Sequence, residues 1–115
     1  MTQTIFVTGI GTGVGETIVS AILTEALQAD YWKPVQTGYK NGTDSEWIKS
    51  VLSNNQSTIY PEAYKLKLPA SPHIAAQNEG IEISSQKIIA ACSGYQVPGK
   101  RLIIEGARRF TCSAE

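Results

Sequence analysis

The feature that most constrains the fold is a glycine-rich stretch, "GIGTGVGETI" at residues 9–18, placed directly after the apolar run "TIFVT". That run is short and apolar, as expected for a strand buried on both faces. The residues after the glycines, "ETIVSAILTEALQA", repeat apolar side chains at helical spacing. A glycine-rich turn between a strand and a helix exposes backbone N–H groups at the helix N-terminus, where they bind anions. The start of the chain therefore predicts a strand, an anion-binding loop and a helix.

The same order of elements recurs along the chain. "YWKPV" at 31–35 predicts a second strand, ended by Pro34 and the turn residues "TGYKNGTD". "SEWIKSVL" then predicts a helix with Thr43 or Asp44 as its cap. The stretch "SNNQSTIYPEAYKLKLPASP" is predicted to be irregular. Next come short helices at 72–78 and around 84–92, then a buried strand, "RLIIE", at 101–105. Alternating strands and helices predict an α/β fold with a parallel sheet covered on both faces, which places ligands at the carboxyl ends of the strands.

The charge balance narrows the class of ligand. Ten basic side chains offset ten acidic ones, so no overall field attracts nucleic acid or an anionic membrane surface. The N-terminus has no basic leader, and no segment approaches the roughly 20 apolar residues of a membrane span, so we expect a cytoplasmic protein. Cys92, Cys112 and His73 lack the spacing of a zinc site. Any anion binding must therefore be local to the glycine-rich loop.

Two nucleotide-binding patterns compete for this loop. The GxGxxG pattern of dinucleotide-binding folds fits in no frame, and no acidic residue ends the second predicted strand. The P-loop pattern, GxxxxGK followed by Ser or Thr, fits with two departures: Gly9 lies one position too early, and Glu16 stands where the lysine belongs. Thr17 occupies the position of the magnesium-binding hydroxyl. At this point a tight turn without a ligand stays open as the alternative.

Three further segments carry a family resemblance: "WKPVQTG" after the second predicted strand, "SPHIAA" at 71–76 and "IIEGA" at 103–107. Together with the loop they resemble dethiobiotin synthetase, over roughly residues 4 to 107. That family has an extended P-loop, GTxTxxGKT, which accounts for the position of Gly9. The resemblance implies a P-loop NTPase-type sheet. It also implies closure of the ureido ring of dethiobiotin from 7,8-diaminononanoate, carbon dioxide, ATP and Mg²⁺, in biotin biosynthesis, by a homodimer.

The resemblance also implies roles for individual residues. Lys33 is the catalytic cation that contacts the carbamate and the γ-phosphate, and Thr37 contacts the substrate. The magnesium ligands are Thr17, Asp44 and Glu105, and an oxygen-only set suits this hard cation. The residues that correspond to the ATP-binding loop are Gly11, Thr12, Gly13, Val14, Gly15, Glu16 and Thr17.

Several of these roles have a structural alternative. A lysine that follows a strand can be a solvated surface residue, a loop threonine commonly bonds its own backbone, and Asp44 could cap a helix. Glu105 is harder to explain as scaffold, because it ends an otherwise apolar strand. We expect His73 to pack or to cap a turn, with "SPH" shaping the wall of the substrate cleft.

Two departures from the family bear on activity. Glu16 replaces the lysine that binds the β- and γ-phosphates. At about 4 Å and an effective dielectric of about 20, one pair of unit charges is worth about 4 kcal/mol, and here attraction becomes repulsion. A carboxylate in the first turn stabilises the helix by roughly 0.3 to 1 kcal/mol. We therefore hypothesise that the loop folds with Glu16 partly filling its own anion site and that ATP affinity is reduced.

The second departure is the ending, where the family continues "EGAGG" and this sequence continues "EGARRFTCSAE". We interpret residues 1–107 as a P-loop ATP-binding domain, the N-terminal half of the family fold with its sheet truncated after the Glu105 strand. Residues 108–115 are interpreted as a divergent tail, with a reading-frame shift after Ala107 as the hypothesis. Missing sheet strands and dimer contacts would impair catalysis.

Two alternatives to the synthetase function stay open. One is another P-loop ATPase, of the partitioning or the cobyrinate amide synthase type. Partitioning ATPases commonly carry a second lysine early in the loop, and residues 9 to 14 contain none. The other is an inactive fragment or pseudoenzyme, which Glu16 and the tail favour, whereas "WKPVQTG" and "IIEGA" favour the enzyme lineage.

Overall fold

The structure, a computed structural model, describes residues 3–8 and 13–106. Its elements in chain order are β1 (Gln3–Val7), α1 (Gly13–Leu27), β2 (Asp30–Trp32), β3 (Val35–Thr37), α2 (Asp44–Val51), β4 (Ile59–Tyr60), β5 (Tyr64–Leu66), α3 (Pro72–Asn78), α4 (Ser85–Gly94) and β6 (Arg101–Glu105). Within these ranges no helix has the length and apolar character needed to cross a membrane.

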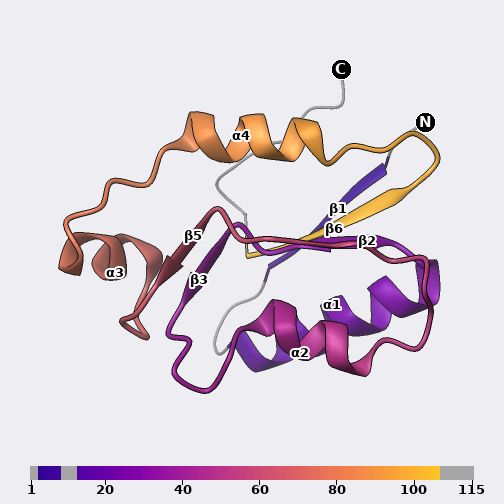
Figure 1. The fold of residues 1–115 in the computed structure, drawn as a ribbon, viewed down its shortest axis with the longest axis horizontal. Helices are drawn as coiled ribbons and strands as arrows, with labels where there is room; N and C mark the ends of the chain where they lie inside the picture. Colours follow the sequence, from indigo (N-terminus) through magenta and orange to yellow (C-terminus); the bar gives the residue numbers. More distant parts are fainter. Residues whose placement is uncertain (1–2, 9–12, 107–115) are drawn as a thin grey trace.

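The main sheet has four strands in the order β1-β6-β2-β4, and all of its neighbouring strands are parallel (Figure 1). Its register sets Val7 opposite Glu105 and Trp32 opposite Ile104. The carboxyl ends of these strands therefore meet at one edge, where open α/β sheets bind their ligands. The predicted α/β class with a parallel sheet is confirmed.

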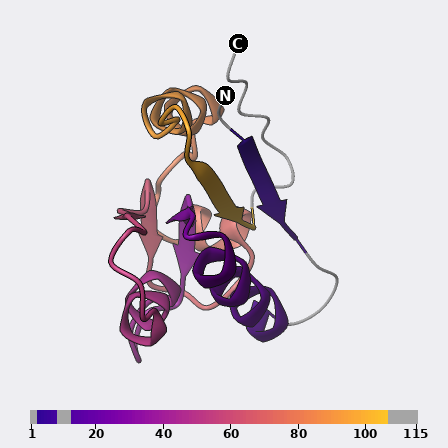
Figure 2. The same cartoon turned by 90° about the vertical axis from the view of Figure 1, so that its right-hand side faces the viewer.

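Helices cover both faces of the main sheet: α1 and α2 lie on one side, and α4 lies on the other (Figures 1 and 2). Alternate residues of β6 supply both cores. Ile103 packs with Ala21 of α1 and Ile48 of α2, whereas Leu102 and Ile104 pack with α4. A strand buried on both faces reads as a continuous apolar run, which explains why "RLIIE" was recognisable in the sequence.

The prediction of one strand at 31–35 is wrong. β2 ends before Lys33, and β3 pairs in parallel with β5 in a separate two-stranded sheet. The cause is Pro34, which has no N–H to donate to a ladder. Its carbonyl oxygen instead accepts hydrogen bonds from the backbone N–H groups of Ala63, at 2.8 Å, and Tyr64, at 3.0 Å. The break leaves Lys33 at the carboxyl edge of the main sheet.

The stretch predicted to be irregular contains two short strands, β4 and β5. Strands of two and three residues are too short to show an alternating pattern, and their partners lie far away in the sequence. The structure confirms the predicted helix at 72–78, the helix that follows it and the strand at 101–105, with end shifts of one or two residues.

Candidate active site

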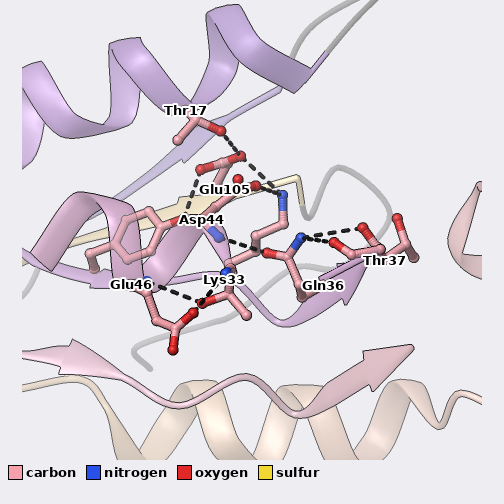
Figure 3. A network of polar contacts seen from close by, with 10 residues as sticks. Thr17, Lys33, Gln36, Thr37, Asp44, Glu46 and Glu105 are labelled. Carbon is pink, nitrogen blue, oxygen red and sulfur yellow. Dashed lines mark hydrogen bonds and ion pairs between the residues drawn. The ribbon is translucent and has the colours of Figure 1, made fainter. Parts of the chain in front are cut away.

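Three charged side chains meet at the carboxyl edge of the main sheet. The ammonium nitrogen of Lys33 lies 2.7 Å from Asp44 Oδ2 and 3.1 Å from Glu105 Oε2. Figure 3 shows Lys33, at the end of β2, reaching towards Asp44 of α2 and Glu105 of β6. The structure thus brings together three residues that the sequence places in one site, and Lys33 is not a solvated surface lysine.

Glu105 is the most deeply buried member of this cluster, at 1% exposure. Its Oε2 accepts hydrogen bonds from Lys33 and from the hydroxyl of Thr17 at 3.0 Å. Its Oε1 accepts a hydrogen bond from the hydroxyl of Tyr31 at 2.7 Å. A buried carboxylate needs such donors, because its loss of hydration is otherwise uncompensated. No sequence pattern indicates a role for Tyr31, which occupies an ordinary position in a short predicted strand.

The electrostatics of the cluster keep Lys33 protonated and Tyr31 neutral. Burial alone would lower the pKa of Lys33, but the charge of Glu105 and the hydrogen bond to Asp44 outweigh it and raise that pKa above its ordinary value. Burial, followed by the nearby charge of Glu105, raises the pKa of Tyr31 well above its ordinary range. Tyr31 therefore acts as a hydrogen-bond donor to Glu105 throughout the neutral range.

A capping box fixes the start of α2 and leaves the Asp44 side chain available. The hydroxyl of Thr43 accepts a hydrogen bond from the backbone N–H of Glu46 at 3.1 Å, and the Glu46 carboxylate accepts one from the backbone N–H of Thr43 at 2.8 Å. Thr43 is thus the cap, and the alternative that Asp44 is there to cap the helix is wrong. Asp44 is the first residue of α2, and its carboxylate pairs with Lys33 instead.

Gln36 connects the two sides of the site, a role that the sequence did not indicate. Its side-chain oxygen accepts a hydrogen bond from the backbone N–H of Asp44 at 3.0 Å. Its amide nitrogen donates to the carbonyl oxygens of Thr37, at 3.2 Å, and Gly38, at 3.1 Å (Figure 3). The first turn of α2 and the loop after β3 are therefore held at a fixed separation.

A pocket of about 850 Å³ opens beside this cluster. Ligand sites commonly have volumes of roughly 300 to 1,000 Å³. Its lining combines polar and apolar residues: Thr17, Lys33, Gln36, Thr37 and Asp44 are polar, and Ile18, Trp47, Pro69 and Ala70 are apolar, together with Gly38. The arrangement suits a molecule with a charged head and an aliphatic body.

The loop after β3 forms a wall of the pocket. The hydroxyl of Thr37 faces no hydrogen-bond partner among the described residues, so the structure does not support its bonding to its own backbone. Gly38 has a φ of +68°, and a Cβ there would lie 2.7 Å from Pro69 Cβ, so only glycine fits. Pro69 and Ala70 form the facing wall just before "SPH", whereas His73 is exposed and does not line the pocket.

The glycine-rich loop lies partly outside the described residues, which exclude Gly11 and Thr12. The others lie at the start of α1: Gly13, Val14, Gly15, Glu16 and Thr17. Thr17 is buried against Glu105. Glu16 lies in the first turn and makes no hydrogen bond or ion pair with any described residue. The hypothesis that Glu16 fills its own anion site stays a prediction, and the tail at 108–115 also lies outside the described residues.

The donor chemistry of the site fits magnesium. Thr17, Asp44 and Glu105 offer only oxygen atoms, and Mg²⁺ is commonly held by one or two carboxylates together with waters and substrate phosphates. No cluster of three or more His, Cys, Asp and Glu side chains occurs in residues 3–8 and 13–106. The two carboxylates already share one cation, the Lys33 ammonium, at the point where they converge.

Comparison with known proteins agrees with this geometry. A family model described as "AAA domain" matches residues 3–112. The chain belongs to this AAA domain family.

Its relatives include three proteins named ATP-dependent dethiobiotin synthetase BioD. The one from Cytophaga hutchinsonii is 55% identical over 102 residues, which are 89% of this chain and 47% of the relative. The one from Christiangramia forsetii is 45% identical over 107 residues, 93% of this chain and 49% of the relative. The one from Brucella anthropi is 41% identical over 107 residues, 93% of this chain and 48% of the relative.

These matches confirm the resemblance to dethiobiotin synthetase that the sequence motifs indicate. The chain spans about half the length of the curated relatives it matches. None of these relatives carries the name of a partitioning ATPase or a cobyrinate amide synthase, so the comparison gives those alternatives no support.

Proposed function

We propose that this AAA domain serves an ATP-dependent dethiobiotin synthetase, which closes the ureido ring from 7,8-diaminononanoate, carbon dioxide and ATP in biotin biosynthesis. The observation that carries the proposal is the Lys33 ammonium held between Asp44 and Glu105 at the rim of a pocket. In this proposal residues 1–107 are a P-loop ATP-binding domain and residues 108–115 are a divergent tail.

Lys33 is the catalytic cation of the proposal. Phosphoryl transfer is catalysed mostly by positioning and by stabilising charge, and a flexible point charge suits the task of following a moving anion. The Lys33 side chain is 15% exposed and lines the pocket. It can therefore turn from the carboxylates to a carbamate and a γ-phosphate without leaving the site.

Nucleotide and metal occupy the side of the pocket next to α1. In the proposal the triphosphate lies on the loop of Gly11, Thr12, Gly13, Val14, Gly15, Glu16 and Thr17. Mg²⁺ is held by Thr17, Asp44 and Glu105, and when bound it neutralises charge on the phosphates. The hydrogen bond from Thr17 to Glu105 supports this arrangement, because it places two of the three ligands in contact.

The diamine occupies the side of the pocket next to the loop after β3. Thr37 has a hydroxyl available for the polar end of the substrate, and Ile18, Trp47 and Pro69 offer an apolar surface for its alkyl chain. Trp47 is 45% exposed and would lose contact with water when that chain binds. Its fluorescence therefore reports substrate binding.

We also propose a cytoplasmic homodimer. Its support is the family resemblance, together with exposed apolar side chains on neighbouring helices α1 and α2 that do not line the pocket: Val19, Ile22 and Val51. Exposed apolar surface of this kind is costly to leave in water and commonly marks an interface.

Calorimetric titration of Mg·ATP, with diaminononanoate present, tests the function in this chain and in its Glu16→Lys variant. We expect binding in both, at least tenfold tighter in the variant, because the lysine restores attraction where Glu16 repels phosphate. Equal affinities would contradict the hypothesis for Glu16. No binding in either protein would contradict an ATP site in this chain.

Trp47 provides a second readout in the same samples. Fluorescence from Trp47 should change on addition of diaminononanoate, whereas fully buried Trp32 supplies a constant background. The Trp47→Phe variant is the control, because it should remove the change in fluorescence while keeping an aromatic surface.

A further inference from the structure

Among the described residues, Glu105 has three hydrogen-bond donors, and they differ in what surrounds them. Lys33 and Thr17 both line the pocket and both donate to Oε2. Tyr31 donates to Oε1 and is not among the residues that line the pocket. Glu105 itself is 1% exposed and does not line the pocket, so its Oε2 lies directly behind two pocket-lining side chains, whereas its Oε1 is held from within the core.

Tyr31 is fixed far more firmly than the other two donors. Its side chain is fully buried, at 0% exposure, and packs with Val7, Ala21 and Ile103 between the sheet and α1. Its hydroxyl lies 2.7 Å from Glu105 Oε1, which is a short and strong hydrogen bond to a charged acceptor. A ring packed in this way has no other position to occupy, so this hydrogen bond persists when the pocket fills.

The other two donors are needed elsewhere when ligands bind. Under the proposed function, Lys33 turns to the carbamate and the γ-phosphate, and Thr17 turns to the metal. Glu105 Oε2 then loses both of its present partners and becomes free to face a divalent cation. Without a third donor the carboxylate would be free to rotate at the moment when its direction matters.

We propose that Tyr31 is a positioning residue that holds the Glu105 carboxylate in the orientation needed to face a divalent cation. The inference rests on the proposed function, because it assigns Glu105 to the metal site. Removing a group that orients a metal ligand through a hydrogen bond commonly lowers the metal affinity by roughly 10- to 100-fold.

Tyr31→Phe is the direct test, because it keeps the packed ring and removes only the hydroxyl. The probe is Mn²⁺ alone, a substitute for Mg²⁺ whose free form is counted by electron paramagnetic resonance. We expect Tyr31→Phe to bind Mn²⁺ roughly tenfold more weakly than the unchanged protein. Glu105→Gln should weaken binding at least as much, because it removes the charge that Tyr31 orients.

Tyr60→Phe is the matched control. The hydroxyl of Tyr60 also donates to a buried carboxylate, Asp30 Oδ2 at 3.4 Å, but at the opposite edge of the sheet. It should leave Mn²⁺ affinity unchanged. If Tyr31→Phe does not fold, para-aminophenylalanine at position 31 replaces it, because this side chain keeps a donor of similar reach. We expect it to retain most of the affinity.

The outcomes separate this inference from the function on which it rests. Equal Mn²⁺ affinity in Tyr31→Phe and the unchanged protein would overturn the role of Tyr31 and leave the metal site standing. Equal weakening by Tyr31→Phe and Tyr60→Phe would also overturn it, since the effect would then come from general destabilisation. No Mn²⁺ binding by the unchanged protein would overturn the metal site and the inference together.

Discussion

Two buried carboxylates lie at opposite ends of the strands of the main sheet, one at the amino edge and one at the carboxyl edge, and their surroundings are alike. Glu105 ends β6 and contacts Lys33 and the hydroxyl of Tyr31. Asp30 starts β2, where Lys100 lies 2.9 Å from its Oδ1 and the hydroxyl of Tyr60 lies 3.4 Å from its Oδ2. Each cluster thus combines one buried acid, one lysine and one tyrosine.

The two clusters differ in charge and in access. At the amino edge Lys100 neutralises Asp30, which also accepts a hydrogen bond from the backbone N–H of Thr58 at 2.9 Å. At the carboxyl edge a second acid, Asp44, shares Lys33, so the side chains of the cluster sum to one negative charge. Only the carboxyl-edge cluster contributes residues to the 850 Å³ pocket. Similar side chains therefore give a neutral cluster at one edge and a negatively charged cluster beside a pocket at the other.

Removing each lysine should produce the largest difference between the clusters. We expect Lys33→Met to lower the free energy of unfolding by about 3 to 5 kcal/mol, because it leaves Glu105 buried beside a second uncompensated acid. Lys100→Met should cost less, since the Lys100 side chain is 29% exposed and its loss opens Asp30 to water. Urea unfolding at neutral pH measures both. Equal losses would contradict the difference in charge that we assign to the two edges.

The pocket can be damaged without changing the charge of either cluster. Gly38→Ala places a Cβ 2.7 Å from Pro69 Cβ at a φ of +68°, and such overpacking costs about 1 to 3 kcal/mol. Gly80→Ala is the control, because Gly80 has a similar φ of +66° but open space around it. The cost of the backbone strain is common to both variants, so the difference in their unfolding free energies measures the contact with Pro69. No difference would mean that the wall relaxes freely.

Much of the fold follows from local patterns in the sequence. The strand before the glycines, helix α1 and strand β6 each carry a continuous signal of apolar spacing. The parallel arrangement then follows from the alternation of strands and helices, and it brings Lys33, Asp44 and Glu105 to one edge before any coordinates are known. The start of α2 was predicted to within one residue, since Thr43 and Asp44 were both candidate caps, and the structure selects Thr43.

The details that complete the site depend on contacts between distant residues. Tyr31 and Glu105 are 74 positions apart, and nothing at position 31 distinguishes a tyrosine that donates to a carboxylate from one that only packs. The sequence does not indicate the role of Gln36 either, because its three hydrogen-bond partners among the described residues are backbone groups. β4 and β5 were missed for the same reason, since their paired residues lie 28 positions away (Tyr31 with Ile59) and 29 positions away (Val35 with Tyr64).

Asp44→Asn should make the two clusters electrostatically alike, each with one acid and one lysine. Because the Asp44 side chain is 33% exposed, we expect a loss of unfolding free energy of about 1 kcal/mol or less. Mn²⁺ affinity should nevertheless fall, as the second carboxylate is what distinguishes the carboxyl edge. Asp30→Asn is the reverse control, with unchanged Mn²⁺ affinity and lower stability. Retained Mn²⁺ affinity in Asp44→Asn would remove Asp44 from the metal site.

The smallest expected effect comes from an acid outside both clusters, which tests whether neutral hydrogen-bond donors alone can lower the pKa of a carboxyl group. Glu25 accepts hydrogen bonds from the hydroxyl and the backbone N–H of Ser53, and from the side-chain amide of Asn54 at 2.9 Å. The hydroxyl of Ser53, then the Asn54 side chain, lowers the pKa of Glu25 from 4.5 to about 2.

Because the folded pKa lies below the unfolded one, the stability that Glu25 contributes is present above pH 4.5 and is lost as the pH falls towards 2. The difference in unfolding free energy between the unchanged protein and Glu25→Gln should therefore shrink between pH 5 and pH 3, while an NMR titration of the Glu25 carboxyl finds its midpoint near 2. A midpoint near 4.5 would show that the hydrogen bonds from Ser53 and Asn54 do not stabilise the charged form of Glu25 in the folded protein.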